Sequence, residues 1–447
     1  MNKLKQQFLC TCVLSVSSLL SQNTYATAFL PQDPRALGMG GVGVAAANSA
    51  QAHFYNPSLL HNARADEDFN FEIMGAIRAA DNDHLIQAMK DFDDEQLFIN
   101  FSDDLASFTT ALARQVIDLN EVLSTRDDFS NSSVALRQGI HDVTGKSITV
   151  DANVGTLLSI PNGQKISWTA YINGWSSFSV QGTLAPNDDQ TMEDIINLLD
   201  FDINSFDPTV ISNALDILDP ENKLQSTLSM NGALFIEYGL SLASKYVTGG
   251  YDIDVGITPK YIQVVTYDYV RSLEELDQNS EPYEQEEEKT YSTFNFDLGI
   301  SKQLTENWKS GIVIKNIIPQ SFKSPSGRSK ARLEPAARVG VSYANNWINL
   351  GADLDLTENA DVISFSKSRF LAMGAEVDVW LLKLRAGYRA NLSAKGGNVP
   401  SIGAGLYLFG LNVDAAIAAN QLDIPSDIDE LLEYDDLSAS VQVGLQF

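Results

Sequence analysis

Charged residues at every second position are the part of this chain best placed for chemistry. Glu376 and Asp378 lie in one candidate strand, and Lys383, Arg385 and Arg389 lie in the next. Because side chains alternate between the two faces of a strand, each set points to a single face. Opposite charges on neighbouring strands can form structural ion pairs, whereas a free guanidinium of Arg385 or Arg389 could bind the carboxylate of a ligand. Both interpretations are kept open.

Enzyme chemistry finds little support in the rest of the sequence. The histidines match no HExxH or other metal-binding spacing, and no GxSxG motif is present. They are His53, His61, His84 and His141. The two cysteines, Cys10 and Cys12, lie close to the amino-terminus, and no other cysteine follows them. We therefore expect no catalytic residue, no metal site and no cofactor, and we expect that the protein is not an enzyme.

The amino-terminal region begins with a segment typical of export. Lys3 and Lys5 precede an apolar stretch at 8–20, and the small residues at 26–28 match a cleavage site before Phe29. The apolar stretch is shorter than a membrane-spanning helix needs, although an uncleaved anchor helix is the alternative. We expect residues 1–28 to be a cleaved signal peptide, which would remove both cysteines and exclude disulfide and dithiol chemistry from the mature chain.

Residues 29–62, which we call the plug segment, are rich in small side chains. Gly38, Gly40 and Gly43 match the spacing GxGxxG, but no strand precedes them and no βαβ unit follows, so we reject a dinucleotide site. Small residues from 36 to 52 instead predict a segment packed closely inside another structure, and Asn56-Pro57 predicts a turn that ends it.

The elements that must position these residues are strands. The last residues, Leu437–Phe447, alternate strictly between apolar and polar side chains and end on an aromatic residue. Similar period-two patterns occur throughout the chain and predict about fourteen strands, with a poorly patterned one at 308–318. They lie near 69–79, 147–160, 163–180, 232–248, 251–270, 290–304, 308–318, 335–344, 347–357, 369–380, 381–391, 399–408, 410–419 and 437–447.

The connections alternate in length, which predicts how the strands are arranged. Short turns, such as Gly249-Gly250 and Phe409-Gly410, alternate with long loops, of which 80–146 and 181–231 are the longest. Short connections on one rim and long ones on the other are typical of transmembrane antiparallel β-barrels. We therefore predict an all-β fold, a barrel of about 14 strands over 63–447, with an apolar face toward lipid and a polar face toward the lumen.

The two longest loops carry a different period. Apolar residues recur at helical spacing in 85–125 and 190–220. We expect amphipathic helices in loops 80–146 and 181–231 that pack on each other over the barrel mouth. The long loops also hold most of the 58 acidic residues, and the chain carries a net charge of −28. Such a surface would repel phosphates, so nucleic-acid binding is disfavoured.

A family resemblance supports this barrel. The residues from Arg35 to Gly41, followed by Phe54-Tyr55-Asn56-Pro57, resemble the amino-terminal hatch of FadL-like outer-membrane transport barrels. The resemblance is greatest to the subgroup described as plasmid-transfer TraF-like proteins. It implies ligand-contacting or gating roles for a set of residues in the plug segment. They are Gly38, Gly40, Gly41, Gly43, Phe54, Tyr55, Asn56 and Pro57.

The resemblance also implies a location and partners. We expect the bacterial outer membrane, with both mature termini in the periplasm and outer-membrane lipid and lipopolysaccharide around the barrel. The closing strand that ends at Phe447 would be the contact with the outer-membrane assembly machinery. The acidic loops would give solubility, or would bind lipopolysaccharide through divalent cations.

Two functions follow as the leading hypotheses. One is a passive FadL-like channel for a small hydrophobic ligand, gated by the plug segment. The other is a structural or partner-binding barrel associated with conjugal transfer, whose acidic helical loops contact the partner. An outer-membrane enzyme is a third hypothesis, but no nucleophile in the sequence supports it.

Overall fold

The protein is described here by a computed structural model. It describes residues 26–62, 68–161, 166–202, 206–218, 224–248, 251–272, 288–363, 367–393, 398–420 and 434–447. The predicted signal peptide lies outside the described residues, apart from 26–28.

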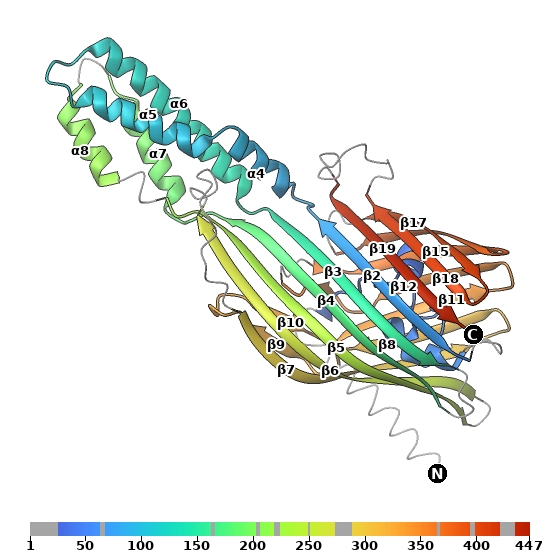
Figure 1. Ribbon diagram of the computed structural model, residues 1–447. Coiled ribbons are helices and arrows are strands. Elements are labelled where there is room, and N and C mark those ends of the chain that lie inside the picture. Colours follow the sequence, from blue (N-terminus) through green and yellow to red (C-terminus); the bar gives the residue numbers. More distant parts are fainter. Residues whose placement is uncertain are drawn as a thin grey trace.

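Fourteen antiparallel strands close into one barrel, which confirms the predicted fold class. Strand β19 pairs with β2 and closes the ring, and Figure 1 shows the two side by side. In barrel order, the strands are β2 (Asn70–Ala80), β3 (Ser147–Ile160), β4 (Ser167–Thr183), β5 (Thr227–Thr248), β6 (Tyr251–Ser272), β7 (Glu288–Gln303), β8 (Trp308–Lys315), β11 (Ala336–Ala344), β12 (Ile348–Asp355), β15 (Phe370–Val379), β16 (Leu382–Asn391), β17 (Val399–Leu408), β18 (Leu411–Ala419) and β19 (Asp436–Gln446).

The alternation in the sequence explains which face of each strand is exposed. In β19, Val441 and Val443 are exposed on the outside, whereas Ser440 and Gln442 are buried on the inside. An apolar outer face and a polar inner face form the architecture of bacterial outer-membrane barrels, in which apolar side chains contact lipid. None of the described helices is long and apolar enough to cross a membrane.

The barrel wall is much taller on one side than on the other. Strands β5 and β6 have 22 residues each, whereas β8 and β12 have 8 each. Because all strands share the rim of the short turns, the extra length of β5 and β6 extends the wall at the opposite, long-loop rim.

Aromatic side chains mark the rim of the short turns. Trp347, Trp380 and Phe409 are exposed there, the last two with 92% and 95% of their surface accessible. Trp380 and Phe409 have φ values of 58° and 50°, in the left-handed region that non-glycine residues rarely adopt. Aromatic girdles of this kind flank the lipid-facing band of outer-membrane barrels.

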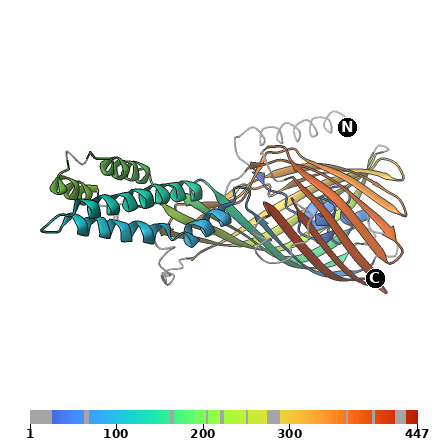
Figure 2. The same ribbon diagram turned by 90° about the horizontal axis from the view of Figure 1, so that it is seen from above.

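The predicted helices form a bundle, which we call the helical arm. Its helices are α4 (Leu85–Asp94), α5 (Leu97–Leu112), α6 (Leu119–Val143), α7 (Asp188–Leu199) and α8 (Pro208–Leu218). They share one apolar core, in which Phe101, Phe108 and Phe129 are fully buried. The expectation that the helices lie over the mouth was wrong. The arm continues the direction of the long strands away from the barrel (Figures 1 and 2). Its apolar side chains pack against one another within the bundle, so they are not available to cover the mouth.

The mouth of the barrel is instead occupied by a hairpin that was not predicted. Strands β9 (Gln320–Lys323) and β10 (Lys330–Leu333) pair with each other inside loop 316–335, and we call them the mouth hairpin. Phe322 and Leu333 pack on Phe235 and Val264 of the tall wall. Nearby, β1 (Ala26–Thr27), β13 (Asn359–Ala360) and β14 (Lys367–Ser368) form a small sheet.

The two ends of the expected mature chain lie at different levels. Phe447 accepts hydrogen bonds from Asp68 and Phe69 at the short-turn rim. Phe29 packs with Val313 and Ala336, toward the long-loop rim. This differs from the expectation that both mature termini lie on the same side, because the plug segment must run down the lumen before β2 begins at the short-turn rim.

Candidate functional site

The plug segment lies in the lumen and is buried over most of its length. It contains α2 (Pro34–Gly38), α3 (Ala52–Tyr55) and the 3-10 helix η1 (Pro57–Asn62). Helix α2 starts where it does because Asp33 accepts hydrogen bonds from the backbone N–H groups of Arg35 and Ala36, and Pro34 suits the first helical turn. Tyr55 donates to the other oxygen of Asp33 at 2.6 Å, which ties the two ends of the segment together.

A belt of glycines on the inner wall allows the plug segment to approach closely. A Cβ on Gly387 would collide with the backbone of Met39 and Gly40, and one on Gly299 would collide with Asn56. Several of these glycines are direct register partners across neighbouring strands. The glycine belt runs over eight neighbouring strands and comprises Gly256, Gly299, Gly311, Gly340, Gly351, Gly374, Gly387 and Gly403.

An ionic cluster joins the plug segment to the wall. Arg35 donates to both oxygens of Glu376, at 3.0 Å from Nε and 2.9 Å from Nη2, and to the Ala46 carbonyl at 2.6 Å. Arg385 lies directly opposite Glu376 in the register and donates to it at 2.7 Å. Its Nη1 reaches Asp414 at 2.6 Å. Every guanidinium in this cluster is therefore already bonded to a carboxylate.

The remaining residues of the predicted ionic set lie in two other places. Lys383 pairs with Asp378 at 3.2 Å, again as a register partner. Arg389 belongs to a separate cluster near the long-loop rim, where it lies 3.4 Å from Asp436. Because Arg385 and Arg389 are buried and face carboxylates, the structure supports ion pairing and not the binding of a ligand carboxylate by either one.

Hydrogen bonds from the plug backbone complete its attachment. Asp353 accepts from the N–H groups of Gly43 and Val44 at 2.8 and 2.9 Å. Asn56 donates to the Val44 carbonyl at 2.8 Å, and Pro57 follows at the start of η1. Gly40 donates to Ser401 at 3.0 Å, and Gly41 stands next to it with a positive φ of 93°.

His53 is a packed residue within the plug segment. Its Nδ1 lies 2.9 Å from the Ala50 carbonyl, and its ring contacts Phe54 and Tyr171. Burial lowers the pKa of His53 from 6.5 to about 3, because the charged imidazolium would lose its hydration. The ring is therefore neutral at physiological pH.

A cavity of about 100 Å³, which we call the mouth cavity, lies between the plug segment, the inner wall of the barrel and residues 361–362 of the loop that follows β12. Phe29, Gln32 and Phe54 contribute from the plug segment. Val362, which packs with Phe322 and Leu333 of the mouth hairpin, lines the opposite side. The cavity is thus bordered by two segments that are not part of the barrel wall.

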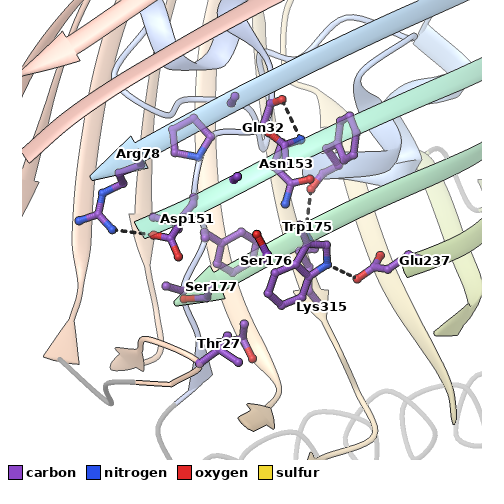
Figure 3. Close-up of a pocket in the computed structure, with 18 of the residues that line it drawn as sticks. Thr27, Gln32, Arg78, Asp151, Asn153, Trp175, Ser176, Ser177, Glu237 and Lys315 are labelled. Atoms are coloured by element: carbon purple, nitrogen blue, oxygen red, sulfur yellow. Dashed lines mark hydrogen bonds and ion pairs between the residues drawn. The ribbon is translucent and has the colours of Figure 1, made fainter. Parts of the chain in front are cut away.

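The wall of the mouth cavity combines aromatic rings with paired charges (Figure 3). Trp175 stacks on Phe235 with ring centroids 4.0 Å apart and donates to Glu237 at 3.0 Å. Arg78 bonds to Asp151 at 3.0 Å and to Asp436 at 2.9 Å. Lys315 donates to the Phe54 carbonyl at 3.1 Å.

A second, polar cavity of about 480 Å³ opens on the other side of the plug segment. We call it the vestibule. Arg35, Glu376, Asp378 and Lys383 line it, together with Tyr407 near the short-turn rim. The plug segment therefore separates an aromatic cavity from a polar one. Among the residues that the structure describes, no group of three or more His, Cys, Asp or Glu is arranged to hold a metal ion.

Several residues of this site could not be identified from the sequence. Arg35 lies 341 positions from Glu376, and nothing in the sequence links them. Asp414 alternates with apolar residues in β18, so the sequence predicts that it points inward. The sequence does not predict that its partner is Arg385. Trp175 and Lys315 belong to no local sequence motif. The mouth hairpin is short and lies in a loop whose sequence shows no clear periodicity.

Comparison with known proteins gives one family and a set of similar folds. A model described as "F plasmid transfer operon, TraF, protein" matches residues 53–355, which is more than half of the chain. No curated protein matches.

Three solved structures illustrate the similar folds. The TodX deltaS2S3 mutant monoaromatic hydrocarbon channel is 11% identical, with a TM-score of 0.46, covering 92% of this chain and 98% of that one. The P. putida toluene transporter TodX is 10% identical, with a TM-score of 0.46 and coverages of 94% and 99%. A Pseudomonas aeruginosa FadL homologue is 10% identical, with a TM-score of 0.45 and the same coverages.

Proposed function

The chain belongs to the F plasmid transfer operon TraF protein family, and we propose that it is an outer-membrane channel for small hydrophobic molecules. In this proposal, the plug segment gates passage between the mouth cavity and the vestibule. The observation that carries it is the mouth cavity itself, a space lined by aromatic rings and bordered by the plug segment, which is not a strand of the barrel wall.

The size and lining of the mouth cavity indicate the kind of ligand. A volume of about 100 Å³ suits a small molecule rather than a long chain. The faces of Phe54, Tyr171 and Trp175 favour an apolar or aromatic guest. The charged groups nearby are held by partners, so a neutral molecule would not have to displace an ion pair.

The ionic cluster at Arg35 is the proposed latch. Movement of the plug segment would break the Arg35–Glu376 pair, but Glu376 would keep Arg385 as a partner. A carboxylate that retains one cation after the latch opens has a smaller cost of opening than one left alone in the lumen. The Arg35–Glu376 pair would hold the plug segment closed, and the Arg385–Glu376 pair would lower the free-energy cost of opening it.

Filling the mouth cavity tests the proposal. Ala76 lines the cavity from β2, so we expect Ala76→Phe to occupy the space that a ligand needs. Val154 is 63% exposed on the outside of β3, so Val154→Phe adds the same bulk toward lipid and serves as the matched control. Uptake of radiolabelled toluene at low external concentration would be measured in a deletion strain carrying each version.

We expect the wild-type chain and V154F to restore uptake, and A76F to lower it several-fold at equal amounts of protein in the outer membrane. Equal uptake with and without the gene would overturn the proposal.

A second function is favoured by the helical arm. The arm has its own buried core and extends away from the lumen, so a channel role does not account for it (Figure 1). Together with family membership, this supports a barrel that presents the arm to a partner during conjugal transfer. Mating efficiency of the same strains, with and without residues 85–143, separates this function from transport.

A further inference from the structure

The mouth hairpin has two chemically different faces. Phe322, Ala331 and Leu333 are buried on one face. The other face is exposed and basic, and it carries Lys323, Arg328, Lys330 and Arg332. Glu334 is the one acidic residue in 319–334, whereas the loops 80–146, 181–231, 271–289 and 420–436 are strongly acidic. The hairpin is therefore a basic patch on an acidic protein.

The apolar face fixes the direction in which the basic face points. Phe322 contacts the rings of Phe235 and Tyr291, with centroids 6.2 and 5.4 Å away. Tyr291 donates to the Lys323 carbonyl at 2.8 Å, and Ser324 donates to Asp268 at 2.9 Å. Because this face is held against the tall wall, the lysine side chains must point away from it.

Two lysines face each other across the hairpin without a counter-ion. Lys323 and Lys330 are register partners, and neither forms an ion pair with any residue in the described part of the chain. Like charges directly opposite each other destabilise a strand pair. An anion held between the two ammonium groups would convert this repulsion into attraction.

The height of the hairpin places this pair near lipid head groups. Gln320, the first residue of β9, donates to the carbonyl of Phe294 at 3.0 Å. Phe294 is 68% exposed on the outer face of β7, at the upper end of its run of outward apolar residues. Lys323 and Lys330 continue beyond that level, on the side where β8 and β11 are short.

We propose that the basic face of the mouth hairpin is a docking site for the phosphate groups of lipopolysaccharide in the surrounding outer leaflet. Lys323 and Lys330 hold one phosphate between them, and Arg328 and Arg332 add to the attraction. The proposal rests on the outer-membrane location in the proposed function, but not on transport, so uptake can fail while docking holds.

The test uses the purified full-length protein in detergent, titrated with purified lipopolysaccharide. The variant is K323Q/K330Q, and the matched control is K90Q/K146Q, which removes the same charge near the helical arm. Binding is followed by the apparent dissociation constant and by the shift in unfolding temperature. Dephosphorylated lipopolysaccharide and inorganic phosphate are the two comparison ligands.

We expect K323Q/K330Q to bind lipopolysaccharide about tenfold more weakly than the wild type, with the control unchanged. Without lipopolysaccharide, the variant should be at least as stable as the wild type, because the repulsion is gone. Dephosphorylated lipopolysaccharide should bind all versions weakly.

Two results would overturn the proposal. One is equal binding of lipopolysaccharide by wild type and K323Q/K330Q, or an equal loss in both variants. The other is that millimolar inorganic phosphate raises the unfolding temperature of the protein as much as lipopolysaccharide does and competes with lipopolysaccharide for binding. That result would identify a site for free phosphate.

Discussion

The plug segment and the helical arm both lie off the barrel wall, but they are stabilised by different forces. The arm is held by an apolar core centred on Phe129, with few contacts to the barrel. The plug segment also packs apolar side chains on the wall, but it adds buried ion pairs, backbone hydrogen bonds and a glycine belt that admits its backbone. Apolar packing gives an element that is stable by itself. Specific polar contacts give one that fits a single position and can exchange partners, as the proposed gating would require.

The largest expected effect is a loss of stability confined to the helical arm, caused by a substitution in its apolar core. Phe129→Ala removes a ring that contacts Phe101 and Phe108, and should destabilise the arm by about 4 kcal/mol. Loss of helical circular dichroism on heating, with unchanged barrel signal, is the readout. Val134→Ala, at a half-exposed position of the same helix, should change little. Simultaneous loss of the barrel signal would show that the two regions are coupled.

The next effect tests the buried ionic cluster beside the plug segment. Arg385→Ala leaves Asp414 without its cationic partner in the lumen, while Glu376 keeps Arg35. We expect a loss of about 3 kcal/mol in the free energy of unfolding, measured in urea by tryptophan fluorescence.

Lys383→Ala is the control for the buried ionic cluster, because its pair with Asp378 is partly open to solvent and should contribute less than about 1 kcal/mol. Equal effects of the two variants would contradict the assigned importance of the buried cluster.

A smaller effect tests the glycine belt. Gly387→Ala should push on the backbone at Gly40 and cost about 2 kcal/mol, mostly by displacing the plug segment. A single cysteine at Ala47, which lines the vestibule, should then react faster with a maleimide. Gly174→Ala meets no atom closer than 3.9 Å and should leave the rate unchanged. An unchanged rate in both variants would contradict the role of the glycine belt in holding the plug segment in place.

The last prediction concerns pH, and its effect is the smallest of the four for a change of one pH unit. The pKa of His53 is lowered to about 3 in the folded protein, so the unfolded chain binds a proton first as pH falls below 6.5. The contribution of His53 is thus complete above pH 6.5 and declines toward pH 3, by about 1.4 kcal/mol per unit at most. His53→Gln should flatten the stability profile in that window. Parallel profiles for wild type and H53Q would contradict a buried neutral ring.

The sequence was informative where one face of an element meets water or lipid. The strands could be predicted because the wall imposes a period of two, and the arm helices because their core imposes a period near 3.6. The mouth hairpin could not be predicted, because a strand of four residues is too short to show a periodic pattern. The glycine belt looks like weak strand sequence, and the Arg35–Glu376 pair joins residues that only the closed barrel brings together.

The most direct test of the central claim is the anomalous scattering of bromobenzene in crystals of the protein. We expect a bromine peak in the mouth cavity beside Trp175 and Phe54 in the wild type, and no peak in A76F. No peak in wild-type crystals, or peaks confined to the lipid-facing surface, would contradict a ligand site in the mouth cavity.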